Sequence, residues 1–328
     1  MQNTSLRLAQ NADPALPPLR LARDCEVSVI VPALNEAKNL PLLIARIHKA
    51  LKGRAYEVIV VDDNSRDDTP AVCEALAQKY PLRLVVRHRA TNGLSGAVLH
   101  GMGIAGGEKI VVMDADLQHP PQKIPELLAK LESGEADFVL GSRYVDGGTT
   151  EETWSWFRRV NSNVATWLAK PFAGGTRDPM SGFFALRRES YENASQLTPL
   201  GYKIALELMC KCRARRIAEV PIHFGERVAG ESKLSFKQQT RYLRHLSRLY
   251  AFTFPRMTLL CKAVVGAVAG WSCGYFTNPA LSTPLSVLAG VAMIFATHPG
   301  AAVNATGNSL GAERVFRFKE LKTSQRAA

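Results

Sequence analysis

The stretch KIVVMDADLQHP, residues 109–120, decides the fold that this sequence predicts. Its apolar run, residues 110–113, predicts a buried parallel strand, and Asp114, Asp116 and Gln118 follow at alternate positions. Open α/β sheets bind their ligands at the carboxyl ends of such strands. Two carboxylates and an amide oxygen suit Mg²⁺ or Mn²⁺, hard cations that also hold phosphate oxygens. In the competing interpretation Asp114 only ends the strand and Asp116 caps the next helix.

Two earlier apolar runs, residues 27–32 and 57–61, are also followed by acidic side chains. Glu36 follows the first run, and Asp62 and Asp63 follow the second. We interpret Asp62 and Asp63 as ligand-contacting residues, because they come at the strand end before the next helix begins. We therefore expect acidic side chains at the ends of three neighbouring strands.

Strands and helices alternate through most of the chain. Further strands are predicted at residues 82–87, 137–141, 183–187 and 217–224. Helices are predicted at residues 38–51, 67–80, 93–105, 121–132, 149–172, 201–216 and 238–254. This alternation is typical of an α/β fold with a doubly wound, mostly parallel sheet.

Residues 101–106, GMGIAG, match the spacing of the dinucleotide-binding fingerprint G-x-G-x-x-G. The fingerprint requires these glycines between a strand and the start of a helix, whereas here they close a helix and precede a strand. We interpret them as a glycine-rich helix end.

The composition limits the classes of partner. The 328 residues carry a formal net charge of +12, which favours an anionic partner: a nucleic acid, an anionic lipid surface or a phosphorylated substrate. The six cysteines lack the paired spacing of a zinc site and the density of a secreted disulfide scaffold. No helix-turn-helix, zinc-finger or RNA-recognition motif is present, so we expect no nucleic acid partner.

The two ends of the chain differ from its centre. Residues 1–24 are rich in Pro, Ala and polar residues and predict a disordered leader. Residues 238–254 predict a basic amphipathic helix, typical of a membrane interface or of a packed surface helix. The apolar segments that follow, broken by Asn278, Pro279 and Pro284, predict a membrane-associated tail with a basic end. The predicted regions are a leader at 1–24, a catalytic domain at 25–233, an interfacial helix at 234–256 and a tail at 257–328.

A glycine-containing loop follows the last predicted strand and carries Arg227 and Lys233. Two cations on such a loop are what a phosphate clamp requires, although most loop cations are simply solvated.

Six motifs then occur in a recognisable order: VSVIVPALNE, VIVVDDNSRDDT, GLSGAVLHGMGIAGGEKIVVMDADLQHPP, DFVLGSRY, DPMSGFFALRR and GERVAGESK. Together they resemble the family 2 glycosyltransferases of the GT-A (Rossmann-like) fold, most closely the dolichol-phosphate (polyprenol-phosphate) mannosyltransferases. The resemblance covers about residues 27–256.

The resemblance implies a role for each matching residue. The nucleotide sugar would be bound by Pro32, Ala33, Glu36, Asp63, Asp114 and Asp116. The metal, Mg²⁺ or Mn²⁺, would be bound by Asp114, Asp116 and Gln118. The acceptor phosphate would meet Arg143, Ser181, Gly182, Arg227 and Lys233. The catalytic residues would be Asp116, Arg143, Arg227 and Lys233, and His119 receives no role.

The implied reaction is an inverting transfer of mannose from GDP-mannose to dolichyl or polyprenyl phosphate, by a membrane-associated enzyme whose catalytic domain lies on the cytoplasmic side. UDP-glucose or another nucleotide sugar is the alternative donor, and a basic nucleic-acid-binding protein is the distant alternative. A processive polysaccharide synthase would need Q-x-x-R-W, whereas residues 238–242 read QQTRY.

Overall fold

The computed structural model describes residues 25–150, 168–195, 197–198, 203–212, 214–225 and 236–277. The chain divides into two compact units, Met1–Tyr242 and Leu243–Ala328. The leader predicted at residues 1–24 lies outside the described residues.

The first unit contains a seven-stranded sheet with the order β3-β2-β1-β4-β7-β5-β8. Its strands are β1 (Val27–Ala33), β2 (Tyr56–Asp62), β3 (Leu82–Val86), β4 (Lys109–Val112), β5 (Phe138–Ser142), β7 (Phe184–Arg187) and β8 (Ile217–Pro221). All neighbours pair in parallel except β7, which is antiparallel to both β4 and β5. The predicted, mostly parallel sheet is thereby confirmed.

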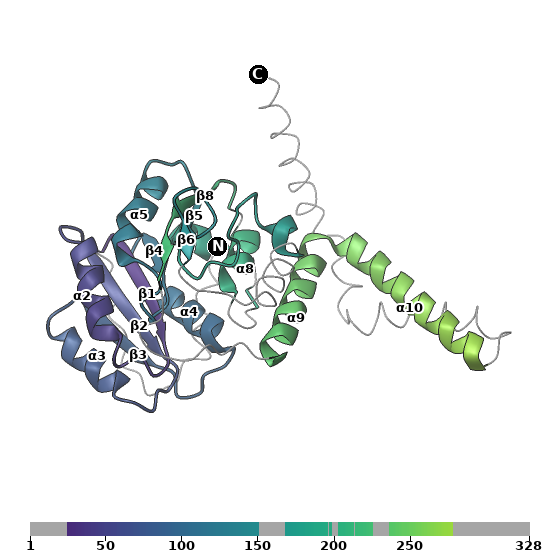
Figure 1. The fold of residues 1–328 in the computed structure, drawn as a ribbon, viewed down its shortest axis with the longest axis horizontal. Coiled ribbons are helices and arrows are strands. Elements are labelled where there is room, and N and C mark those ends of the chain that lie inside the picture. Colours follow the sequence, from purple (N-terminus) through teal and green to yellow (C-terminus); the bar gives the residue numbers. More distant parts are fainter. Residues whose placement is uncertain are drawn as a thin grey trace, which may run out of the picture. The chain divides into compact units, whose positions relative to one another are not determined.

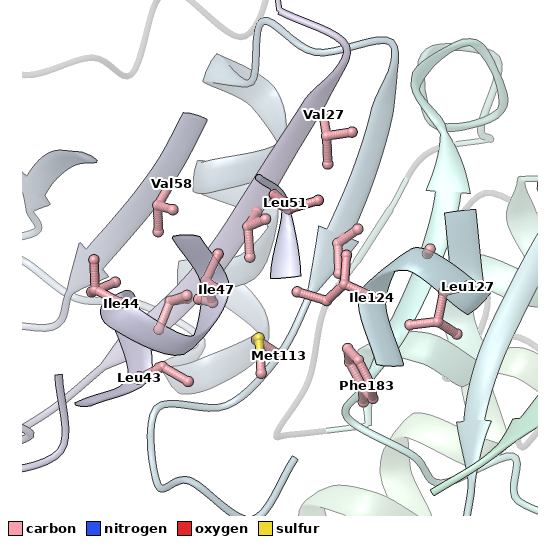
Figure 2. Close-up of a cluster of buried hydrophobic side chains, with 14 of the residues drawn as sticks. Val27, Leu43, Ile44, Ile47, Leu51, Val58, Met113, Ile124, Leu127 and Phe183 are labelled. Atoms are coloured by element: carbon pink, nitrogen blue, oxygen red, sulfur yellow. The ribbon is translucent and has the colours of Figure 1, made fainter. Parts of the chain in front are cut away.

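The helices of this unit lie on both faces of the sheet (Figure 1). They are α2 (Leu40–Ala50), α3 (Thr69–Ala77), α4 (Gly93–Ile104), α5 (Ile124–Glu132), α7 (Arg188–Glu192) and α8 (Ile204–Lys211), with 3₁₀ turns η2 (Pro121–Lys123) and η3 (Lys170–Phe172). Figure 2 shows α2 and α5 packing on one face, where Ile44, Ile47 and Leu127 meet residues of β1, β2 and β4. All seven residues of β1 are buried, as expected of a strand covered on both faces, and Ser28 is the one polar residue among them.

Helix α4 covers the opposite face, and one of its glycines explains the false dinucleotide fingerprint. A Cβ on Gly101 would lie 2.5 Å from Cγ2 of Ile30 and 3.0 Å from Cγ2 of Val61. Gly101 therefore allows α4 to approach the sheet closely. The predicted helix end is confirmed, because α4 ends at Ile104 within this stretch.

Two predicted elements are corrected. The helix predicted at residues 149–172 is wrong at its start, because Thr149–Thr150 form strand β6, which pairs in parallel with β9 (His223–Phe224). The strand predicted at residues 217–224 is two strands, β8 and β9, and Ile222 lies between them: its backbone N–H donates to the carbonyl of Ser142 on β5, and its carbonyl accepts from Thr149 on β6. Residues 151–167 lie outside the described part of the chain.

The C-terminal segment contains helices α9 (Phe236–Thr253) and α10 (Pro255–Thr277). On α9, Leu246 and Leu249 are buried whereas Arg244 and Arg248 are exposed, so the predicted amphipathic character is confirmed. Among the described residues, no helix combines the length and the apolar character needed to cross a bilayer.

Candidate active site

Two acidic side chains leave the sheet directly after β4. The backbone N–H of Met113 still bonds to the carbonyl of Ile30 on β1, so the strand pairing extends to this residue. Beyond it Asp114 and Asp116 are half-buried, whereas Ala115 and Leu117 between and after them are buried. The alternation points both carboxylates toward one surface at the carboxyl end of the strand.

The loop then turns inward at Leu117, whose φ of 65° is left-handed. The backbone N–H of Gln118 donates to Oδ1 of Asp116 at 3.2 Å, and its side-chain Nε2 donates to the carbonyl of Gly225 at 3.0 Å. The helix that follows has no side-chain cap, which excludes the interpretation of Asp116 as its cap. Gln118 thus connects the acidic loop to Gly225. The predicted site residues Arg227 and Lys233 belong to residues 226–235, which lie outside the described part of the chain.

His119, to which the sequence assigned no role, is buried and supports the backbone of the acidic loop. Its Nδ1 accepts the backbone N–H of Asp114 at 3.1 Å, and its ring stacks on Phe183 with centroids 5.5 Å apart. Burial lowers the pKa of His119 to about 4. The negative charge of Asp116 opposes this effect, and the positive charge of Arg143 adds to it. The imidazole is therefore neutral near pH 7, as an acceptor at Nδ1 requires.

Residue 182, just before β7, leaves little room for a side chain. A Cβ on Gly182 would lie 2.9 Å from Oδ2 of Asp114 and 3.2 Å from Cε1 of His119. Its neighbour Ser181 is buried, and its hydroxyl donates to the carbonyl of Gly141 at 2.6 Å. Gly182 thus lies directly against the acidic loop, whereas Ser181 bonds to the end of β5. The predicted role of both residues toward an acceptor stays a prediction.

The loops after β1 and β2 are joined by hydrogen bonds. The backbone N–H of Glu36 donates to Oγ1 of Thr69 at 2.9 Å, and that of Ala37 donates to Oδ2 of Asp67 at 3.1 Å. The side chain of Glu36 accepts from Nδ2 of Asn39 at 2.7 Å. These contacts fix the edge that carries the predicted nucleotide-binding residues Pro32 and Ala33, both buried at the end of β1.

The two aspartates at the end of β2 make different contacts. Asp62 is fully buried and accepts from both the hydroxyl and the backbone N–H of Ser65, so it stabilises the turn and does not face a ligand. Asp63 forms an ion pair with Arg87, with Nε 2.8 Å from Oδ1. Burial raises the pKa of Asp63, although the charge of Arg87 opposes this effect.

Arg143 directly follows β5 and is held by a carboxylate. Its Nε and Nη2 donate to the two oxygens of Asp178 at 2.8 and 2.9 Å, and its backbone N–H donates to Asp178 at 3.1 Å. The guanidinium lies over the rings of Tyr144 and Phe224, 5.2 and 5.0 Å from their centroids. Arg143 is therefore fixed in one orientation beside the acidic loop.

Lys203, just before α8, is a further cation of this site that the sequence did not reveal. Its Nζ donates to the carbonyl of Met180 at 3.3 Å. Burial, followed by the charge of Arg143, lowers its pKa to about 8, and Asp178 and Asp114 oppose this effect. The charges of Arg143, Asp178 and Asp114 thus all act on Lys203. No sequence motif marked this lysine, because only the folding of α8 against η3 brings it near β4.

The donor set at the acidic loop fits a hard divalent cation. Among the described residues no three His, Cys, Asp or Glu side chains cluster as ligands, and the predicted carboxylate ligands Asp114 and Asp116 would be two in number. Mg²⁺ is commonly held in this way, by one or two carboxylates completed by water and substrate phosphates.

The sheet order and the acidic loop after β4 define a GT-A glycosyltransferase. The sequence model of the family described as Glycosyl transferase family 2 matches residues 28–194. The chain belongs to this glycosyltransferase family.

Among its relatives is a dolichol-phosphate mannosyltransferase of Pyrococcus furiosus, 46% identical over 68% of this chain and 63% of the relative. Another, from Saccharomyces cerevisiae, is 42% identical over 72% of this chain and 91% of the relative. The alignment therefore spans just under two thirds of the archaeal relative.

A likeness in structure supports the fold. Glucosyl-3-phosphoglycerate synthase from Mycobacterium tuberculosis, crystallised with Mn²⁺, UDP-glucose and phosphoglyceric acid, has a TM-score of 0.54 at 24% identity. The match covers 70% of this chain and 79% of that one.

The buried imidazole predicts a measurable dependence of stability on pH. The pKa of His119 is about 4 in the folded state against 6.5 for a model histidine, so the unfolded state binds more protons between these values. The stabilisation is full above pH 6.5 and is lost as the pH falls toward 4. We expect thermal unfolding of wild type to shift down over this range by more than that of His119→Gln. His223→Gln, at an exposed histidine, is the control, and parallel profiles of wild type and His119→Gln would contradict the assignment.

Proposed function

We propose that this protein transfers mannose from GDP-mannose to dolichyl or another polyprenyl phosphate, giving polyprenyl β-mannosyl phosphate and GDP. The observation that carries the proposal is the acidic loop after β4, with Asp114 and Asp116 held beside Arg143 and Lys203. The relatives named dolichol-phosphate mannosyltransferase support the acceptor and the sugar.

The leaving group determines what the site must do. Departure of GDP places negative charge on the diphosphate, and a divalent cation bound there supplies charge stabilisation and a template for the phosphates. Asp114 and Asp116 would hold the cation, and Gln118 fixes the loop and would complete the metal set. Arg143 and Lys203 contribute positive charge from the β5 and α8 side, where preorganised charge stabilises the transition state.

Arg227 and Lys233 are proposed to complete the phosphate clamp. They follow Gly225, which exchanges two hydrogen bonds with Gln118: its N–H donates to the Gln118 carbonyl at 3.2 Å and its carbonyl accepts from Nε2 at 3.0 Å. Gly225, two residues before Arg227 in the sequence, therefore lies at the acidic loop.

The acceptor requires no strong general base. A phosphate monoester carries a charge of about −1.5 to −2 near pH 7, so its oxygen can attack the anomeric carbon directly. His119 cannot act as that base in this geometry, because its Nδ1 accepts the backbone N–H of Asp114. A single displacement predicts inversion at the anomeric carbon.

The nucleoside is proposed to lie along the loops after β1 and β2. Pro32, Ala33 and Glu36 form one side of this edge, and Asp63 with its counter-ion Arg87 forms the other. A carboxylate next to a guanidinium offers an acceptor and a donor side by side, which suits the N1–H and O6 edge of guanine. The same pair suits the N3–H and O4 edge of uracil, so the donor must be tested directly.

The enzyme is further proposed to act at a membrane surface, with its catalytic domain on the cytoplasmic side. Helix α10 exposes several large apolar side chains, each 53–61% accessible: Met257, Leu260, Val264, Val265 and Val268. Exposed arginines, including Arg244, Arg248 and Arg256, accompany them. Apolar side chains with neighbouring cations favour an anionic lipid interface.

The donor and metal assignments are tested together by incubating the purified protein with labelled GDP-mannose or UDP-glucose, with and without polyprenyl phosphate and Mn²⁺. We expect metal-dependent transfer from GDP-mannose to the lipid, and loss of transfer with a chelator. Asp116→Ala should reduce turnover by about 10²-fold or more, since it removes charge stabilisation of the leaving group. Glu126→Ala, at an exposed carboxylate of α5, is the matched control. Transfer only from UDP-glucose would refute the donor, and full activity of Asp116→Ala would refute the metal role.

Membrane binding is tested by flotation of the full chain with anionic and with zwitterionic vesicles. Replacing Leu260 and Val264 together by Glu should weaken binding to anionic vesicles roughly tenfold or more, because each buried side chain of this size contributes about 1.5–3 kcal/mol. Leu42→Glu, at an exposed leucine of α2, controls for added negative charge. Unchanged binding of the double variant would exclude α10 as the lipid-contacting surface.

A further inference from the structure

Arg143 and Asp178 form a nearly buried ion pair at the edge of the active site. The side chains are 13% and 1% exposed, and both carboxylate oxygens accept from the guanidinium. A bidentate pair of this kind fixes the plane of the guanidinium as well as its position. Asp178 additionally accepts the backbone N–H of Arg143, so the backbone and the side chain are held by one carboxylate.

Asp178 is in turn held by a second carboxylate. Glu219, on β8, accepts the backbone N–H of Asp178 through Oε1 at 3.0 Å and that of Arg177 through Oε2 at 2.9 Å. Glu219 pairs in register with Leu140 on β5, the strand that Arg143 follows. A chain of contacts therefore leads from the sheet through Glu219 and Asp178 to Arg143.

The pairing of Arg143 with Asp178 opposes a contact of Arg143 with the carboxylates of the acidic loop. The charges of Asp116, Arg143 and Asp178 all act on the imidazole of His119, which places Arg143 close to the acidic loop. An arginine without Asp178 would be drawn to Asp114 or Asp116, the carboxylates that a cation must occupy. The bidentate contact with Asp178 sets the position and the plane of the guanidinium instead.

We propose that Asp178 is a positioning residue for glycosyl transfer, which acts through Arg143 and is anchored by Glu219. The inference rests on the proposed function, since the task of Arg143 is to meet the phosphates of the donor. Asp178 itself needs no contact with substrate.

A similar pair at the other end of β5 provides a matched control. Asp137 accepts the backbone N–H groups of Arg215 and Arg216 at 3.2 Å and pairs with Nη2 of Arg216 at 3.0 Å. It lies at the amino end of β5, on the edge of the sheet opposite the acidic loop. Asp137→Asn removes an Arg–Asp pair that has the same kinds of contact but is more exposed, 59% and 25%, and it does so without touching the site.

The test is a double-mutant cycle of Asp178→Asn and Arg143→Ala, measured as kcat and KM for the donor. Asp178→Asn should lower kcat/KM roughly 10- to 100-fold, the range for groups that orient functional side chains. In the Arg143→Ala background the same change should cause no further loss, because Asp178 acts only through that arginine. Asp137→Asn should retain wild-type kinetics.

Equal losses in both backgrounds, or wild-type kinetics of Asp178→Asn, would overturn the proposal. If Asp178→Asn does not fold, as judged by circular dichroism, Glu219→Gln replaces it in the cycle with the same expectations, because it leaves the pair intact and loosens only its anchor. If wild type transfers no sugar, the proposed function fails by itself. The cycle is then measured on the Kd of Mn²⁺ with the nucleoside diphosphate that binds, GDP or UDP, where additive changes would again overturn the role of Asp178.

Discussion

The hydrogen bond from the backbone N–H of Asp114 to Nδ1 of His119 is the contact on which the candidate site depends. It requires a neutral imidazole, and burial against Phe183 and Phe224 keeps the ring neutral. The backbone of Gly182 lies close to the same two residues, since a Cβ there would come within 2.9 Å of Oδ2 of Asp114 and 3.2 Å of Cε1 of His119. Residues at the ends of β4, β7 and β9 therefore contact the imidazole of His119, which supports the backbone of the acidic loop.

The charges of the described residues around the acidic loop are nearly balanced before any substrate binds. Asp114, Asp116 and Asp178 face Arg143 and Lys203, so among these described residues the carboxylates exceed the cations by one when Lys203 is protonated. In the proposed reaction a bound divalent cation would reverse the sign of this set, which would favour a diphosphate.

Much of the fold could be predicted from the sequence because strands covered on both faces are written as continuous apolar runs. The runs that became β1, β2 and β4 also ended in acidic residues, which located the site. Local patterns failed where long-range contacts decide. Asp62 was predicted to contact a ligand, but each of its carboxylate oxygens accepts a hydrogen bond from Ser65 within the turn. Thr149 and Thr150 joined a strand because His223 and Phe224 lie beside them. Lys203 lies in none of the motifs, and although Asp178 opens the motif DPMSGFFALRR, its contact with Arg143 joins positions 35 residues apart that only the fold brings together.

The most direct test of the central claim is anomalous diffraction at the manganese edge from crystals grown with Mn²⁺ and GDP. The account predicts one strong peak about 2.1 Å from a carboxylate oxygen of Asp116 or Asp114, bridging to the diphosphate, with the guanidinium of Arg143 still paired to Asp178. A manganese ion bound away from both aspartates, or a diphosphate bound without it, would contradict the account.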